Sequence, residues 1–168
     1  KKEALERVAE VVDGLYKKGY KVKLSIIGET KTNFEKKTNK KFSEGIVFFG
    51  RIPQNNVFKY IASADFSIVI RPIATNTMAG FPTKFVESLN AGTPVIANLT
   101  SDLGLYLKND FNGFVVKDDS KEEIRKRIIS ILELPKSKIE EMKLNAKKTA
   151  IENFDYRGYS NKIQSFIK

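Results

Sequence analysis

The segment 71–97 carries the residues whose types and spacing best suit a chemical role. A helix is expected over 84–91, with Pro82 in its first turn, where the missing N–H costs nothing. The backbone N–H groups around 79–83 and the helix dipole favour a phosphate group there. Lys84 adds a mobile positive charge, and the two oxygens of Glu87 can accept hydrogen bonds from both hydroxyls of a diol. The pattern therefore predicts a site for a phosphorylated, hydroxyl-rich ligand.

Simpler interpretations of the same residues stay open. Lys84 and Glu87 are also spaced as an i, i+3 surface pair, which is worth only about 0.2–0.5 kcal/mol. Arg71, at the end of an apolar run, is either a candidate anion stabiliser or an ordinary solvent-facing arginine. The turn alone would explain Gly80.

The elements that must position these residues follow from the pattern of apolar positions. Short runs that are almost continuously apolar are typical of strands buried on both faces, and they lie at 22–27, 46–49, 66–70, 94–97 and 114–116. Helical patterns separate them, at 5–15, 55–63, 84–91, 120–132, 137–150 and 159–167. The lysine-rich segment 32–42 is expected to form a helix or a mobile loop. This alternation predicts a single α/β domain with an open, doubly wound, mostly parallel sheet flanked by helices.

Capping signals refine the ends of these helices. Capping boxes are expected at Ser120–Glu123 and again at Ser137–Glu140, with Pro135 ending the helix between them. Gly19 is a natural stop for the first helix. A doubly wound domain normally begins with a strand, whereas this sequence opens with a helix, so we expect the first strand to lie ahead of residue 1 in a longer protein.

Composition excludes several classes of chemistry. The 168 residues include no cysteine and no histidine, so disulfides, thiolate metal sites, the usual zinc ligand sets and histidine-dependent triads are excluded. The net charge of +10 lies in 1–41 and 106–168, whereas 42–105 is neutral. Solvated helix faces explain this excess, with weak attraction to an anionic membrane surface as an alternative. Nucleic-acid binding is not expected, because no aromatic–basic module occurs.

The segment 81–97, Phe-Pro-Thr-Lys-Phe-Val-Glu-Ser-Leu-Asn-Ala-Gly-Thr-Pro-Val-Ile-Ala, closely resembles the donor-site motif of GT-B glycosyltransferases of the large family-four group. The apolar runs that end in Gly28 and Gly50, and the Asn112-Gly113 turn, resemble further signals of that family in the same order. The resemblance covers nearly the whole chain. It implies the C-terminal, nucleotide-sugar-binding domain of a two-domain enzyme, with a Rossmann-like half of the GT-B fold and an N-terminal acceptor domain outside this sequence.

The resemblance also implies roles for individual residues. Glu87 matches the glutamate that holds the nucleotide ribose, Arg51 and Ile52 match the loop against the base, and 78–83 matches the loop facing the sugar and diphosphate. The implied substrate-binding residues are Gly28, Arg51, Ile52, Met78, Ala79, Gly80, Phe81, Pro82, Thr83, Lys84 and Glu87.

The sequence departs from the family pattern in three places. A second family glutamate, eight positions before Glu87, is Ala79 here, which puts the usual grip on the transferred sugar in doubt. The family's later glycine pair and glutamate are replaced by Ser101, Asp102 and Leu105. The arginine and lysine that usually grip the diphosphate would lie ahead of Lys1.

The implied reaction is transfer of a sugar from a nucleotide diphosphate sugar to a glycan or lipid-linked acceptor in polysaccharide or glycolipid assembly, with retained anomeric configuration. Preorganised N–H groups and cations can stabilise the departing diphosphate without a metal, so no cofactor is expected. No catalytic residue is identified, and Lys84 and Arg71 are candidate anion stabilisers.

The resemblance carries expectations beyond the site itself. The isolated domain should transfer no sugar, and the protein should be cytoplasmic, with attachment to the inner face of the membrane left open. The alternative function is a degenerate, non-catalytic Rossmann-like module that binds a nucleotide or glycan. A dinucleotide site is disfavoured, because neither a glycine-x-glycine-x-x-glycine turn nor a P-loop occurs.

Overall fold

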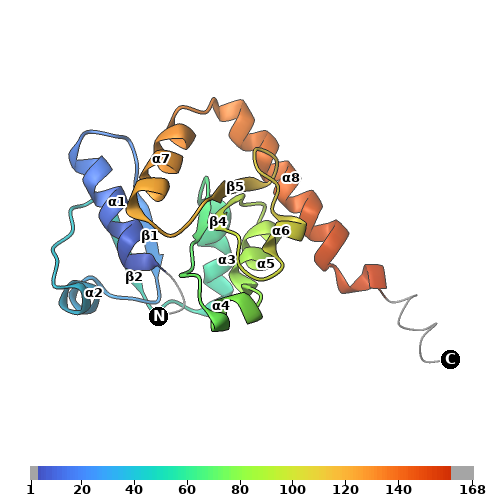
Figure 1. Ribbon diagram of the computed structural model, residues 1–168, viewed down its shortest axis with the longest axis horizontal. Coiled ribbons are helices and arrows are strands. Elements are labelled where there is room, and N and C mark those ends of the chain that lie inside the picture. Colours follow the sequence, from blue (N-terminus) through green and yellow to red (C-terminus); the bar gives the residue numbers. More distant parts are fainter. Residues whose placement is uncertain (1–3, 160–168) are drawn as a thin grey trace.

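The computed structural model describes residues 4–159, and strands and helices alternate along them (Figure 1). The elements are α1 (Leu5–Lys17), β1 (Leu24–Ile27), α2 (Lys31–Thr38), β2 (Ile46–Gly50), α3 (Gln54–Ser63), β3 (Ser67–Val69), α4 (Thr75–Ala79), α5 (Thr83–Asn90), β4 (Val95–Asn98), α6 (Leu103–Tyr106), β5 (Gly113–Val116), α7 (Lys121–Leu132), α8 (Lys136–Phe154) and a 3-10 turn (Tyr156–Tyr159). Every expected strand is present, with ends that differ by at most two residues from those of the apolar runs that predict them.

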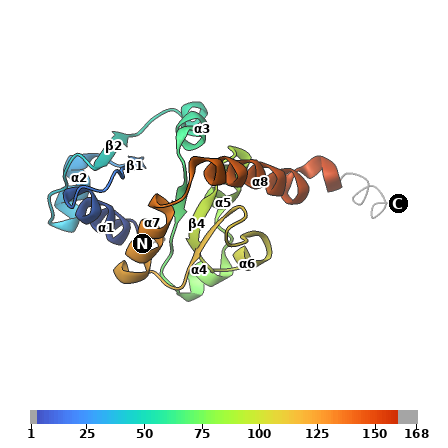
Figure 2. The ribbon, with the colours of Figure 1, turned by 90° about the horizontal axis from the view of Figure 1, so that it is seen from above.

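The strands pair in parallel, which confirms the predicted α/β class. They form two sheets instead of one open sheet: β1 pairs with β2, and β3, β4 and β5 follow one another in that order. Helices cover both faces, with α3 and α5 on one side and α1 and α7 on the other (Figure 2). The carboxyl ends of parallel strands in one sheet meet at the same edge, where ligands of such folds bind.

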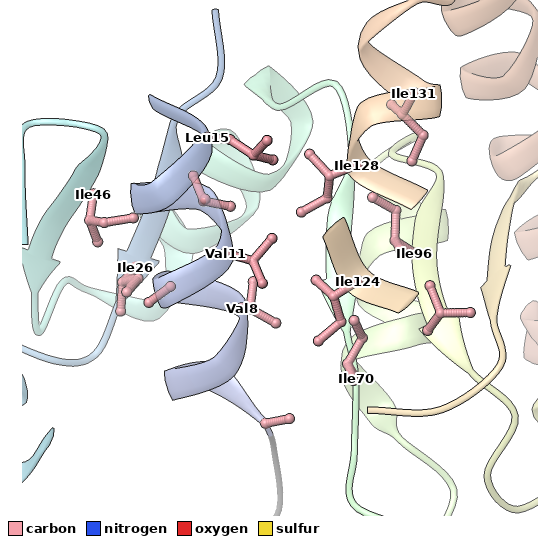
Figure 3. Packing of buried hydrophobic residues seen from close by; sticks show 14 of the residues in the cluster. Val8, Val11, Leu15, Ile26, Ile46, Ile70, Ile96, Ile124, Ile128 and Ile131 are labelled. Atoms are coloured by element: carbon pink, nitrogen blue, oxygen red, sulfur yellow. The ribbon is translucent and has the colours of Figure 1, made fainter. Parts of the chain in front are cut away.

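Helix α1 joins the two sheets by packing on α7. Val8 and Val11 of α1 face Ile124 and Ile128 of α7 in one hydrophobic cluster (Figure 3). The same cluster includes Ile26 and Ile46 from the sheet of β1 and β2. It also includes Ile96 of β4 and Ile70, the residue that follows β3. The two sheets therefore share one core, although their strands are not paired with each other.

A second cluster fixes α5, the helix that carries the candidate site. Phe85 and Leu89 are fully buried there, together with Val95 and Ala97 of β4. Phe154 of α8 closes the cluster, with its ring centroid 6.3 Å from that of Phe85. Phe85 and Leu89 form the apolar face of the helix, which leaves its other face for polar residues.

The two predicted capping boxes have different outcomes. Half of the first box is present: the Ser120 side chain accepts a hydrogen bond from the Glu123 N–H at 3.3 Å, whereas the Ser120 N–H donates to Asp118 Oδ1 at 2.9 Å. The box at Ser137–Glu140 was wrong, because α8 begins at Lys136 with Pro135 as its N-cap. Ser137 therefore lies inside the helix, where its hydroxyl cannot act as the cap.

Other helix boundaries also differ from the expected ones. Two short helices, α4 and α6, occupy segments that the apolar pattern assigns to loops. The helix expected at 32–42 forms over Lys31–Thr38, and Pro82 is the N-cap of α5 rather than a residue of its first turn. The helix expected at 159–167 lies outside the described residues, apart from Tyr159 at the end of the 3-10 turn.

Candidate functional site

The ends of β1 and β2 lie side by side at one edge of their sheet. The Gly28 N–H donates to the Gly50 carbonyl at 2.7 Å, and the Gly50 N–H donates to the Glu29 carbonyl at 3.2 Å. Both glycines have positive φ, 90° and 62°, a conformation that other residues rarely adopt. Arg51, which is exposed, and Ile52, which is half-buried, follow directly. Three predicted site residues, Gly28, Arg51 and Ile52, therefore share this edge.

The loop after β3 is held from inside by Arg71. This side chain is only 6% exposed, and its Nη1 donates to the carbonyls of Thr77 at 3.1 Å and Gly80 at 2.7 Å. These contacts fix the loop that leads into α5. The placement differs from that of a solvent-facing arginine, and an anion-stabilising role for Arg71 stays a prediction.

Asn98 joins the ends of β3 and β4. It is fully buried, its Oδ1 accepts from the Arg71 N–H at 2.9 Å, and its Nδ2 donates to the Arg71 carbonyl at 2.7 Å. The sequence did not predict these two hydrogen bonds between Asn98 and the Arg71 backbone. The only signal for them was a polar residue directly after an apolar run, which does not distinguish a buried partner from a surface one.

Thr77, also missed from the sequence, shapes α4. Its Oγ1 accepts from the Ala74 N–H at 3.0 Å and lies 2.6 Å from the Pro72 carbonyl, to which it can donate. Because Thr77 points inward, Met78 and Ala79 on the same short helix remain exposed to solvent. Two of the residues predicted to face the sugar, Met78 and Ala79, thus lie on a helix rather than on an irregular loop.

The entrance to α5 is anchored by its apolar residues. The ring of Phe81 lies 5.7 Å from Tyr106 and 6.0 Å from Phe154, measured between centroids. Pro82 is buried and occupies the N-cap position, with no side-chain hydrogen bond capping the helix. Thr83, the first helical residue, is exposed. Phe81 and Pro82 consequently hold the backbone of the helix entrance in place, while Thr83 faces solvent.

Lys84 and Glu87 line a groove of 1210 Å³. Both side chains are exposed, one turn apart on α5, and Ser25 and Ile27 of β1 line the same groove. Ser88 is buried beneath them and donates from Oγ to the Lys84 carbonyl at 2.8 Å. The polar face of α5 therefore lines a groove, and ligand sites are usually concave.

The described part of the chain offers neither a metal site nor a membrane span. Within residues 4–159, no group of three or more Asp and Glu side chains could hold a metal ion. In the same part of the chain, no helix is long and apolar enough to cross a membrane.

Comparison with known proteins identifies a family for most of this chain. The family model described as "Glycosyl transferases group 1" matches residues 1–149. No curated protein matches the chain.

Solved structures share the fold at low identity. Anabaena HepE, in complex with UDP and glucose, has a TM-score of 0.70 and 18% identity over 94% of this chain and 44% of its own. Staphylococcus aureus TarM, in complex with fondaparinux, alpha-GlcNAc-glycerol and UDP, has a TM-score of 0.76 and 15% identity over 98% of this chain and 33% of its own.

The C-terminal domain of LpcC from Francisella tularensis has a TM-score of 0.71 and 19% identity, over 91% of this chain and 80% of that structure. The present chain thus spans less than half the length of HepE and TarM and most of the length of an isolated C-terminal domain. With its parallel α/β fold and a family match over most of its length, this chain belongs to the group 1 glycosyl transferases and corresponds to the C-terminal domain of the GT-B fold.

Proposed function

We propose that this domain binds a nucleotide diphosphate sugar, and that the enzyme containing it transfers the sugar to a glycan or lipid-linked acceptor with retained configuration. The observation that carries the proposal is that Lys84 and Glu87, one turn apart on the exposed face of α5, both line one groove. The family match supports the reaction class, and the UDP-bound structures of HepE and TarM support the ligand class.

Lys84 and Glu87 each suit a different part of such a ligand. The Lys84 ammonium lies in the first turn of α5, where the helix dipole also favours negative charge, so the diphosphate belongs there. Glu87 lies one turn further along the helix, and its carboxylate can accept hydrogen bonds from both ribose hydroxyls. Arg51 and Ile52, at the neighbouring strand end, are the proposed contacts of the base.

Catalysis needs stabilisation of the diphosphate as it leaves the sugar. A cation and a helix N-terminus supply this through fixed charge, without a metal or a covalent intermediate. We place Lys84 in this role, with Arg71 holding the loop that carries Met78, Ala79 and Gly80 toward the sugar. The acceptor belongs to the other domain of the enzyme, so the present domain alone should bind nucleotide weakly and transfer nothing.

The test is calorimetric titration of this domain with uridine diphosphate and guanosine diphosphate, each compared with its 2′-deoxy form. Glu87→Ala should weaken binding of the ribose forms by about tenfold or more, since hydrogen bonds to a charged group are lost. It should leave the 2′-deoxy forms less affected. Glu122→Ala is the matched control, because it removes an exposed carboxylate from the first turn of α7, away from the groove.

Two outcomes would contradict the proposal. Unchanged affinity of Glu87→Ala for the ribose forms would remove the ribose assignment. Absence of nucleotide binding at millimolar concentration would favour a degenerate module that has lost its donor, in line with Ala79 standing at the position of a family glutamate.

A further inference from the structure

Two segments of the chain meet at the carboxyl edge of the sheet formed by β3, β4 and β5. Nη1 of Arg71 donates to the carbonyls of Thr77 and Gly80, which both belong to the segment after β3. The same atom lies 3.5 Å from Oγ1 of Thr100, a fully buried residue in the segment after β4. Because β3 and β4 are parallel neighbours, both segments leave the same edge of the sheet, at which ligands bind in such folds.

Asp102 is the single acidic residue in these two segments. The segment 70–82, between β3 and α5, contains neither aspartate nor glutamate. In the segment 99–106, which runs from the end of β4 to the end of α6, Asp102 alone carries a carboxylate. Any negative charge that these two segments bring to the candidate donor site is therefore that of Asp102.

The carboxylate of Asp102 is exposed and has both oxygens available. Asp102 is the N-cap of α6, where the side chain of an aspartate commonly accepts a hydrogen bond from the helix. Here it accepts none, and within residues 4–159 no hydrogen bond or ion pair engages this carboxylate. The backbone around it is nevertheless fixed, because the Leu103 N–H donates to the Thr100 carbonyl at 3.3 Å. The Leu105 N–H donates to the Asp102 carbonyl at 3.0 Å.

The sugar is the part of the proposed ligand that belongs at this edge. The proposed function places the diphosphate at Lys84 and the base at Arg51 and Ile52, and a phosphate would be repelled by an aspartate. It places the sugar at the segment that includes Ala79. That segment is joined to the segment of Asp102 through the one guanidinium nitrogen that contacts both.

We propose that Asp102 selects the sugar of the donor: it accepts hydrogen bonds from sugar hydroxyls and disfavours a sugar that carries its own carboxylate. The inference rests on the proposed function, because it assigns a further contact of the same ligand. An ionised carboxylate only accepts hydrogen bonds, so the hydroxyls of a neutral hexose can donate to both of its oxygens. A uronic acid would place a second negative charge beside it. The expected donor therefore carries a neutral hexose rather than a uronic acid.

Titration of the chain with uridine diphosphate, uridine diphosphate glucose and uridine diphosphate glucuronic acid, followed by nuclear magnetic resonance, tests the proposal. Asp102→Asn keeps the size of the side chain and removes its charge. The ratio of the affinity for the glucose ligand to that for uridine diphosphate should fall about fivefold, since hydrogen bonds to a charged group are weakened. The affinity for the glucuronic acid ligand should rise about threefold, because like charges no longer meet. Glu122→Gln, exposed on α7, is the matched control and should change neither quantity.

A second variant tests whether the charge itself is responsible. Ala79 is exposed on the neighbouring segment, so Ala79→Glu combined with Asp102→Asn returns a carboxylate to the same edge of the sheet. This double variant should recover at least about half of the lost preference for the glucose ligand, and its affinity for the glucuronic acid ligand should fall again. A residue that only held its own loop in place would not be replaced by a charge on another segment.

Three results would overturn the inference. An unchanged ratio in Asp102→Asn would show that the carboxylate does not meet the sugar. An equal loss of affinity for all three ligands, or no recovery in the double variant, would assign Asp102 to the structure of its loop. Absence of uridine diphosphate binding by the unaltered chain would remove the proposed function as well, whereas normal binding with no effect of Asp102→Asn would remove this inference alone.

Discussion

At the scale of single residues, the chemistry of the candidate site depends on Lys84. Its ammonium is the positive charge that α5 presents at the groove. Lys84→Gln should weaken binding of uridine diphosphate by roughly tenfold at low salt, and the difference should shrink as salt rises, because an exposed charge is screened. Binding of uridine, which has no phosphate, should not change. Calorimetry at two salt concentrations measures both effects, and Lys126→Gln, exposed on α7, is the control.

Arg71 lies in the loop after β3, which leads into α5, and it has a structural effect. Arg71→Met would leave the carbonyls of Thr77 and Gly80 without this donor inside the protein. The expected loss in free energy of unfolding is about 3 kcal/mol, since buried polar groups would go unpaired. Arg51→Met, at an exposed arginine, should change stability by less than about 0.5 kcal/mol. Urea denaturation compares them, and equal losses would show that the Arg71 contacts do not stabilise the loop.

At the scale of elements, two glycines should respond in opposite directions to alanine. A Cβ at Gly113 would lie 2.1 Å from the Val95 carbonyl oxygen and 2.8 Å from its nitrogen, so Gly113→Ala should separate β4 from β5. We expect a loss of about 3 kcal/mol or more. A Cβ at Gly14, within α1, would meet nothing within 4 Å, so Gly14→Ala should gain about 0.5–1 kcal/mol. Thermal unfolding of both variants checks the two signs.

Helix α1 is also tied to the turn before β2 by Asp13. Its Oδ1 accepts from the Ser43 N–H at 2.7 Å, and its Oδ2 accepts from the Lys17 ammonium at 2.6 Å. Burial alone would raise the pKa of Asp13, but the hydrogen bonds from Lys17 and Ser43 outweigh it and lower that pKa below its ordinary value.

The lowered pKa sets the direction of a pH effect. The carboxylate contributes stability above the ordinary aspartate pKa, and this contribution is lost as the pH falls through the lower pKa of the folded state. The free energy of unfolding should therefore exceed that of Asp13→Asn at neutral pH, and the difference should shrink in acid. Chemical denaturation across this range measures it, and a difference that is constant with pH would exclude the carboxylate charge as its cause.

At the scale of the whole molecule, the sequence predicts the layers better than their connections. Apolar runs such as 22–27 and 94–97 predict parallel strands correctly, because burial on both faces leaves an unbroken hydrophobic pattern. The pattern carries no information about which strands pair, so it could not predict that β1 and β3 would belong to separate sheets.

The same limit applies to the candidate site. Lys84 and Glu87 could be placed on one face of a helix from their spacing alone, and the structure adds the groove beside them. The supports beneath them could not be predicted. The bonds of Arg71 to Gly80 and to Asn98 join residues 9 and 27 positions apart, and they depend on a folded arrangement that apolar periodicity does not record.

The hydrogen bonds between Asn98 and the Arg71 backbone have a practical consequence for producing this protein in a secretory host. Asn98-Leu99-Thr100 has the form of an N-glycosylation acceptor, yet both amide atoms of Asn98 are engaged with the Arg71 backbone and the side chain is fully buried. An oligosaccharide could be attached only before β3 and β4 come together. A glycan found at this asparagine would therefore mark molecules that had not completed folding.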